Sequence, residues 1–100
     1  MLAELRSYTI TPGCTDALLE QFRAVSLPLF QQLGITVYGP WLHQLPKGQQ
    51  FIYLLEFADA RERDTLMDAF RSAPAWRVAQ EARNGLIPLI AGQEVKLVSR

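Results

Sequence analysis

Glu4, Arg6 and Tyr8 occupy alternate positions of the first strand-like segment, and they are the side chains best placed to do chemistry. Because a β-strand points every second residue to the same side, these three side chains share one face. An acid, a guanidinium and a phenol on a covered face need mutual pairing or a polar cavity. The simplest interpretation is structural: Arg6 forms an ion pair with Glu4 or Glu56, and Tyr8 packs against that pair.

A second interpretation makes Arg6 and Tyr8 the polar anchors of a small-molecule pocket. Phe22 and Trp41 would be its apolar walls, and His43 would line it as well. Tyr8 and His43 are then the two candidate catalytic residues. The structural and the functional interpretation are compatible with each other.

His43 is the single histidine of the chain. An imidazole exchanges its proton near neutral pH, which suits a general base, but a partly exposed imidazole just before a loop is also ordinary. With no second histidine and with Cys14 as the single cysteine, the sequence predicts no metal site. It also lacks the glycine-rich and nucleophile motifs of nucleotide-binding proteins and serine hydrolases.

The composition predicts one small domain that spans residues 1–100. Hydrophobic residues make up 49% of the chain, which excludes disorder and is more than one small core hides, so we expect an oligomer. Ten basic and ten acidic residues cancel, which argues against a nucleic-acid or membrane partner. The lone cysteine fits a reducing compartment, and the sequence opens without a basic leader or an apolar run, so we expect a cytoplasmic protein.

The hydrophobic pattern predicts a strand and a long helix in the first third of the chain. Alternation from Leu2 to Thr11 predicts the strand, which a Pro-Gly turn ends. Helical spacing then predicts a helix from Thr15, or the residue before it, to Leu33, with Gly34 as its left-handed stop. Pro28 lies inside this helix, where we expect a kink because proline has no N–H to donate.

A second strand is predicted from Ile35 to Leu45, with Val37, Trp41 and His43 on one face. The Gly39-Pro40 pair within it predicts a bulge or an edge position. After a hairpin loop, a third strand from Phe51 to Phe57 is apolar on both faces. Both of its faces must therefore be covered.

The last third of the chain predicts two shorter helical pieces and a final strand. An Asp-x-x-Glu capping pattern begins a short helix that includes Phe70, and the charged run 59–64 is typical of its solvated face. Pro74 starts a further helical piece that Asn84-Gly85 ends. The final strand is predicted over 93–98, after the apolar connection "LIPLIAG".

The resulting order, β-α-β-β-α-β without a repeat or a linker, predicts an α+β domain of the ferredoxin-like plan. In that plan a four-stranded antiparallel sheet carries its helices on one face. The opposite face is still apolar and needs a partner. A symmetric homodimer that packs sheet against sheet, closing an α+β barrel, would cover it.

Four stretches of the chain resemble the NIPSNAP family, within the dimeric α+β barrel superfamily. They are "ELRSYTITPG" from Glu4, "GPW" from Gly39, "FIYLLEFADARER" from Phe51 and "PAW" from Pro74. The first is the most specific, since the family pattern is close to E-L-R-x-Y-x-x-x-x-G. One departure is Pro40, which stands where the family usually has an aromatic residue.

The resemblance implies a homodimer and a cavity between sheet and helices in each protomer, but no settled reaction. Related branches of the superfamily include cofactor-independent monooxygenases, isomerases and haem-handling proteins. For this chain we expect no cofactor. Haem with His43 as axial ligand would rest on analogy with the superfamily alone.

Our leading hypothesis is a protein that binds a small hydrophobic or aromatic molecule, with a cofactor-independent oxidoreductase or isomerase as its enzymatic form. The alternative is a non-enzymatic interaction or scaffold module whose sheet face serves only dimerisation. A cavity of roughly a few hundred cubic ångströms that reaches Tyr8 or His43 would favour the first hypothesis. A protomer filled by its own side chains would favour the second.

Overall fold

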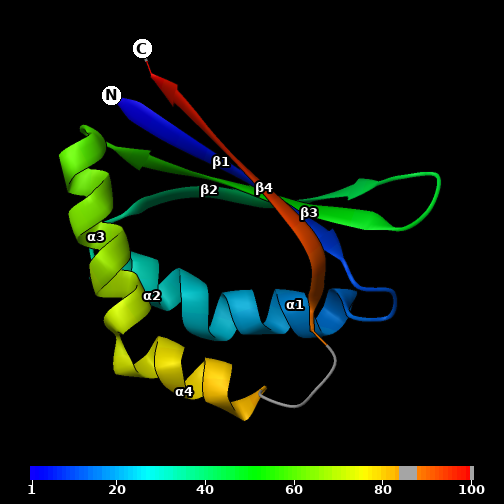
Figure 1. Cartoon of the computed structure of the whole chain (residues 1–100). Coiled ribbons are helices and arrows are strands. Elements are labelled where there is room, and N and C mark those ends of the chain that lie inside the picture. Colours follow the sequence, from blue (N-terminus) through cyan, green and yellow to red (C-terminus); the bar gives the residue numbers. More distant parts are fainter. Residues whose placement is uncertain (84–87, 100) are drawn as a thin grey trace.

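The computed structural model describes residues 1–83 and 88–99, and its strands form one antiparallel sheet with the helices on one face (Figure 1). The strands are β1 (Leu2–Ile10), β2 (Thr36–Gln44), β3 (Gln49–Phe57) and β4 (Ile90–Ser99). Their order across the sheet is β2-β3-β1-β4, so β1 is central and β2 lies at an edge. The predicted ferredoxin-like α+β fold is confirmed. We call the sheet face without helices the open face.

The first helical stretch continues from Thr15 to Gln32 in three pieces. These are α1 (Thr15–Gln21), a π-helical turn η1 (Phe22–Ser26) and α2 (Leu27–Gln32). The N–H of Leu27 bonds to the Phe22 carbonyl five residues earlier, which is the π pattern. Pro28 is the second residue of α2, directly after this turn, so its missing N–H falls where the regular hydrogen-bond ladder is already interrupted. The helix therefore continues past Pro28 as predicted, and the irregularity near the proline takes the form of a π turn.

Gly34 ends α2 in the way its sequence position predicts. Its φ of +76° is left-handed, a conformation that glycine adopts without a steric cost. Its N–H donates to the Gln31 carbonyl, and the Ile35 N–H donates to the Phe30 carbonyl. Together these two bonds form a Schellman ending, which turns the chain back toward the sheet as β2.

Helices α3 (Ala60–Ser72) and α4 (Pro74–Ala82) complete the helical layer. The Asp59 carboxylate accepts from the Glu62 N–H at 2.8 Å, as the capping pattern predicts. The Glu62 side chain accepts from the N–H of Ala58, one residue before the cap, at 3.3 Å. Helix α4 has no fully buried residue. Its predicted end at Asn84-Gly85 lies outside the described residues.

A bulge in β2 changes which of its side chains face the helices. The pairing of β2 with β3 shifts by one residue between Tyr38 and Trp41. Residues paired across antiparallel strands point to the same face. Val37 lies opposite Leu55, on the helix side, whereas Trp41 lies opposite Ile52, on the open face.

The prediction that Val37 shares a face with Trp41 and His43 is therefore wrong. A two-residue period does not hold through a bulge, because one extra residue inverts the alternation. The predicted bulge at Gly39-Pro40 and the edge position of this strand are both confirmed. Gly39 suits the bulge because its φ is +102° and because a Cβ there would lie 3.1 Å from the Ile52 carbonyl oxygen.

Two strands begin earlier than their apolar patterns predict. β3 begins at Gln49, because the ladder with β2 continues over the polar residues next to the hairpin loop. β4 begins at Ile90 and not at Gln93, and all of its residues after Ile90 are exposed. Backbone hydrogen bonds extend a ladder regardless of side-chain polarity. The first part of the "LIPLIAG" connection lies outside the described residues.

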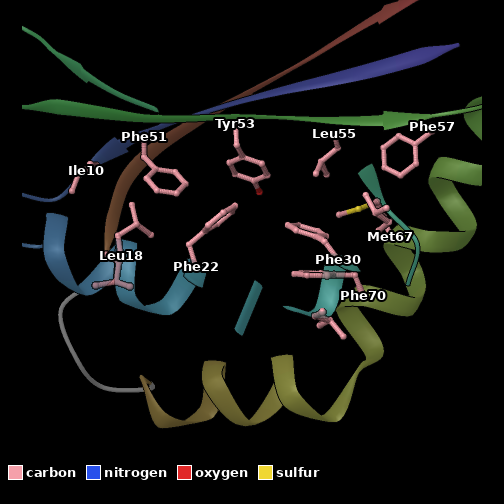
Figure 2. Packing of buried hydrophobic residues seen from close by; sticks show 13 residues of the cluster. Ile10, Leu18, Phe22, Phe30, Phe51, Tyr53, Leu55, Phe57, Met67 and Phe70 are labelled. Atoms are coloured by element: carbon pink, nitrogen blue, oxygen red, sulfur yellow. The ribbon is translucent and has the colours of Figure 1, made fainter. Parts of the chain in front are cut away.

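The core lies between the sheet and the helices, and six of its thirteen buried residues are aromatic (Figure 2). Phe30 stacks on Phe70 with ring centroids 4.5 Å apart, and Phe22 meets Tyr53 at 5.0 Å. The buried apolar cluster comprises Ile10, Leu18, Phe22, Leu29, Phe30, Ile35, Phe51, Tyr53, Leu55, Phe57, Met67, Phe70 and Leu89. The hydrophobic stabilisation of the described fold is therefore concentrated on the helix side of the sheet.

Candidate functional site

A buried carboxylate, Glu4, organises the polar residues beneath the helices. It points from the central strand β1 to the helix side and has 0% exposed surface. One carboxylate oxygen accepts from Nε of Arg6, and the other accepts from Nε of Arg63 on α3, both at 2.5 Å. Removing either arginine would leave part of a buried charge without a partner, which is strongly destabilising.

The predicted ion pair between Arg6 and Glu4 is thus present. Glu56, the other partner considered for Arg6, lies opposite Ala3 on the open face, where its carboxylate accepts from the Tyr38 hydroxyl at 3.4 Å. The sheet separates Glu56 from Arg6. The structural interpretation therefore holds for Glu4 and not for Glu56.

Arg6 connects this ion pair to two tyrosines. Its Nη1 donates to the Tyr8 hydroxyl at 3.1 Å, and the hydroxyls of Tyr8 and Tyr53 lie 2.7 Å apart across β1 and β3. Figure 2 shows the Tyr53 hydroxyl pointing from β3 into the space between the sheet and the helices. We call the hydrogen-bonded series Arg63, Glu4, Arg6, Tyr8 and Tyr53 the polar chain.

The protonation of the polar chain follows from its contacts. Burial alone would raise the pKa of Glu4, but the hydrogen bonds and charges of Arg6 and Arg63 outweigh burial and lower it. Burial would lower the pKa of Arg6, yet Tyr53, Tyr8 and Glu4 raise it above its ordinary value. Burial, and next the neighbouring Tyr8, raise the pKa of Tyr53 well above that of a free phenol. At neutral pH Glu4 is therefore an anion, Arg6 a cation and Tyr53 a neutral phenol.

A cavity of about 80 Å³ lies against this chain, between the sheet and the helices. Its polar lining comes from Arg6, Tyr8, Tyr53, Gln21 and Ser26, and most of its other walls are aromatic. At about 30 Å³ per molecule, the volume corresponds to two or three waters. Small-molecule sites usually measure about 300–1,000 Å³, so the cavity as it stands holds only a small group.

One wall of the cavity is easier to displace than the others. Trp76 of α4 lines the cavity and packs against Phe70 with ring centroids 4.8 Å apart. Because α4 has no fully buried residue, few contacts oppose its movement. An outward shift of Trp76 would enlarge the cavity without breaking the sheet.

The structure brings together three of the five residues predicted to bind a ligand. Arg6, Tyr8 and Phe22 all line the cavity. Trp41 and His43 lie on the open face, beyond the sheet, because the β2 bulge inverts the alternation before them. The five residues therefore do not form one site.

Of the two catalytic candidates, Tyr8 lies at the cavity and His43 does not. His43 Nδ1 lies 3.1 Å from Oε1 of Gln50 on β3, and both side chains are on the open face. As a base, His43 could act only on a molecule bound to that face. Within residues 1–83 and 88–99 no three His, Cys, Asp or Glu side chains are grouped to hold a metal ion. No helix in the same part of the chain is long and apolar enough to cross a membrane.

Two members of the polar chain, Arg63 and Tyr53, are missed by the sequence reasoning. The charged run 59–64 is typical of a solvated face, yet Arg63 precedes the buried Met67 and Phe70 at helical spacing and so lies on their side of α3. Tyr53 stands at an inward position of β3, where a buried phenol needs a hydrogen-bond partner. Spacing is the signal that could have found both.

Comparison with solved structures places the fold among known proteins. An uncharacterized NIPSNAP domain protein from Burkholderia xenovorans matches with a TM-score of 0.83 and 20% identity, over 100% of this chain and 94% of that chain. The Atu4242 protein from Agrobacterium tumefaciens matches with a TM-score of 0.82 and 18% identity, over 99% of this chain and 92% of that chain. An antibiotic biosynthesis monooxygenase matches with a TM-score of 0.63 and 17% identity, over 100% of this chain and 98% of that chain. Likeness at these identities shows the fold alone.

The sequence itself gives the family. No curated protein is similar enough to count as a match. The NIPSNAP family model, in contrast, matches residues 3–99, which include every member of the polar chain. This match covers nearly the whole sequence, so the chain belongs to the NIPSNAP family, as its resemblance to that family implies.

Proposed function

We propose that this protein binds a small hydrophobic or aromatic molecule in the cavity between its sheet and its helices. The observation that carries the proposal is the group of Arg6, Tyr8 and Tyr53, a cation and two phenols joined by hydrogen bonds against a cavity with mostly aromatic walls. Sites for small molecules combine such apolar walls with a few fixed polar groups. Arg6 and Tyr8 are the polar anchors in this proposal, and Phe22 is one of the walls.

The volume of the cavity limits what enters it. An engineered apolar cavity of about 150 Å³ binds benzene, and this cavity measures about 80 Å³. A polar head group with a short apolar chain fits the cavity as it stands. An aromatic ring fits once Trp76 and α4 move outward, and we include this movement in the proposal.

The enzymatic form of the proposal is a cofactor-independent oxidoreductase or isomerase. Arg6 and the two phenols are hydrogen-bond donors that would stabilise negative charge developing on a substrate oxygen. Among the described residues that line the cavity there is no imidazole and no carboxylate, so Tyr8 is the proton-transfer candidate at this position. The proposal assigns His43 no part in the chemistry.

A thermal-shift screen against small aromatics, quinones, flavins, haem and fatty acids tests the proposal. A ligand at 100 times its dissociation constant should add about 2.7 kcal/mol to the free energy of unfolding. Tyr8→Phe should weaken that effect, and His43→Ala, on the open face, is the matched control that should leave it unchanged. The same response from wild type and Tyr8→Phe would remove Tyr8 from the site, and no response to any class would reject the binding function.

A second variant tests whether Trp76 limits the size of the ligand. Trp76→Ala removes part of the wall on α4, so ligands the size of an aromatic ring should bind it more tightly than they bind wild type. Isothermal titration with benzene derivatives measures the difference. Equal or weaker binding to the variant would show that Trp76 does not close this cavity.

The alternative function is a non-enzymatic interaction or scaffold module. The observation that favours it is the cavity volume of about 80 Å³, below the usual range for small-molecule sites. In this alternative the polar chain only stabilises the protomer, and the sheet face serves dimerisation. Absence of any ligand response in both wild type and Trp76→Ala would make it the preferred function.

Under either function we propose a homodimer that packs open face against open face. Leu5, Ile52 and Leu54 lie at the centre of this face. Trp41 lies beside them on the edge strand β2 and is 53% exposed. An apolar surface of this kind is typical of an interface between identical subunits. Light scattering at micromolar concentration should give twice the chain mass of 11.3 kDa.

A pair of neighbouring substitutions tests the face that is used. Trp41→Arg places a charge on the open face and should give monomers. Leu42→Arg places the same charge on the next residue, which is 43% exposed but lies opposite Phe51 on the helix side, and should leave the dimer intact. Dissociation by both variants, or by neither, would argue against this interface.

A further inference from the structure

The polar chain leaves one phenolic hydrogen without an acceptor. Tyr8 and Tyr53 carry two hydroxyl hydrogens, and the single bond between the two hydroxyls uses one of them. Their other neighbour in the chain, Arg6, is a donor only, so it cannot accept the second hydrogen. This count is the same whichever tyrosine donates. Tyr53 is 4% exposed and lines the cavity, so water outside the protein does not reach it freely.

Arg6 adds further donors at the same place. Its two hydrogen bonds to protein use Nε, toward Glu4, and Nη1, toward Tyr8. A guanidinium has five N–H hydrogens, so three remain besides the two that bond to Glu4 and Tyr8. Arg6 lines the cavity, and its side chain is 14% exposed.

In the described part of the chain, the acceptors near these donors do not bond to the remaining hydrogens. Each oxygen of Glu4 accepts from one arginine, Arg6 or Arg63. The remaining polar side chains of the cavity, Gln21 and Ser26, form no hydrogen bond with the polar chain in the described residues. Besides Glu4, one further carboxylate contacts the polar chain: Asp64 pairs with Arg63, and its side chain is 68% exposed. Among its described lining residues the cavity therefore presents a cation and an excess of donors, and no carboxylate.

We propose that the ligand of this cavity is a small organic acid whose carboxylate accepts hydrogen bonds from Arg6 and from the Tyr8–Tyr53 pair. This inference rests on the proposed function, because it assumes that the cavity binds a small molecule. A carboxylate supplies two oxygens with the geometry that a guanidinium matches. Because Arg6 and Arg63 share the buried carboxylate of Glu4, the charge of the acid balances the second cation of this group in a site shielded from water. The apolar part of the acid contacts the aromatic walls and, when it is larger, displaces Trp76.

Matched pairs of acids and amides test the charge of the ligand. Titrations at pH 7 would use propionate with propionamide and benzoate with benzamide, on the wild-type protein and on Trp76→Ala. Each acid should bind at least about tenfold more tightly than the amide of the same shape, since hydrogen bonds to charged groups are the stronger kind. Amides that bind as tightly as acids would overturn the acid inference and leave the binding function standing.

Variants of the polar chain locate the interaction. Arg6→Lys keeps the charge next to Glu4 but loses the forked donor, and Tyr53→Phe removes one phenol and keeps the ring. Both should reduce the preference for the acid over the amide, while His43→Ala on the open face should preserve it. A preference that survives both substitutions would place the carboxylate elsewhere and overturn the inference. No binding of acids or amides to wild type or to Trp76→Ala would reject the proposed function together with it.

Discussion

The two faces of the sheet are built from the same strands and differ in how their side chains are satisfied. On the helix side, aromatic rings close around a fully buried carboxylate, and the polar chain links its charges by hydrogen bonds. On the open face, Leu5, Ile52 and Leu54 lie beside the exposed Trp41, and the ion pair between Glu94 and Lys96 is itself exposed. The difference indicates that the helix side determines the stability of the protomer, and that the open face is available for association.

The largest expected effect comes from the buried carboxylate. Glu4→Gln removes the charge between Arg6 and Arg63 and should lower the free energy of unfolding by about 3–5 kcal/mol. Glu94→Gln is the matched control, because Glu94 is 62% exposed and its pairing with Lys96 is worth little. Urea unfolding measures both variants. Similar losses in the two would contradict the assignment of stability to the helix side.

Acid should weaken the helix side through the same residue. The pKa of Glu4 is lowered in the folded protein, so its stabilising effect is complete above the unfolded value of about 4.3 and is lost as the pH falls through the folded value. Wild type should therefore lose stability on acidification below about pH 4.3. Urea unfolding at pH 7, 5, 4 and 3 should show a shallower loss for Glu4→Gln, and parallel curves would exclude Glu4 as the titrating group.

A smaller effect separates the tyrosines of the two faces. Tyr53→Phe removes a buried hydroxyl that bonds to Tyr8 and should lower the free energy of unfolding by about 0.5–1.5 kcal/mol. Tyr38→Phe is its counterpart on the open face, where the residue is 45% exposed and its bond to Glu56 is 3.4 Å long. It should change stability by less than about 0.5 kcal/mol. A larger loss for Tyr38→Phe would reverse the comparison.

The smallest effect is expected at His43. His43→Ala removes an exposed contact with Gln50 and should change the free energy of unfolding by less than about 0.5 kcal/mol. Thermal unfolding of the two proteins at the same concentration measures it. A loss above about 1 kcal/mol would mean that the proposed dimer interface extends as far as His43.

The sequence predicts most of the fold because its local signals agree with one another. Gly34 ends the long helix, Asp59 caps α3, and Gly39-Pro40 marks the bulge at the edge of the sheet. Each of these features depends on residues close together in the chain. The start of β4 is predicted less well, because its ladder with β1 depends on residues that are far apart in the sequence.

The candidate site is only half predictable for the same reason. Arg6 and Tyr8 follow from alternation within one strand, and the Glu4–Arg6 pair follows with them. Arg63 lies 59 positions away from Glu4, and only the three-dimensional packing of α3 against the sheet brings them together. Trp41 and His43 are misplaced because the sequence predicts that a bulge exists, but not how many residues it inserts.

The bulge at Gly39-Pro40 also has an evolutionary consequence. Deleting one of these two residues would restore strict alternation along β2. Trp41 would then stand two positions after Tyr38 and would still lie opposite Ile52, so Trp41 and His43 would keep their place on the open face. The bulge therefore lets this edge strand carry one extra residue while Trp41, Leu42, His43 and Gln44 keep the faces they would have in a regular strand one residue shorter. A strand of unchanged length that paired without the bulge would instead exchange these four side chains between the surface proposed for dimerisation and the side of the sheet that carries the cavity.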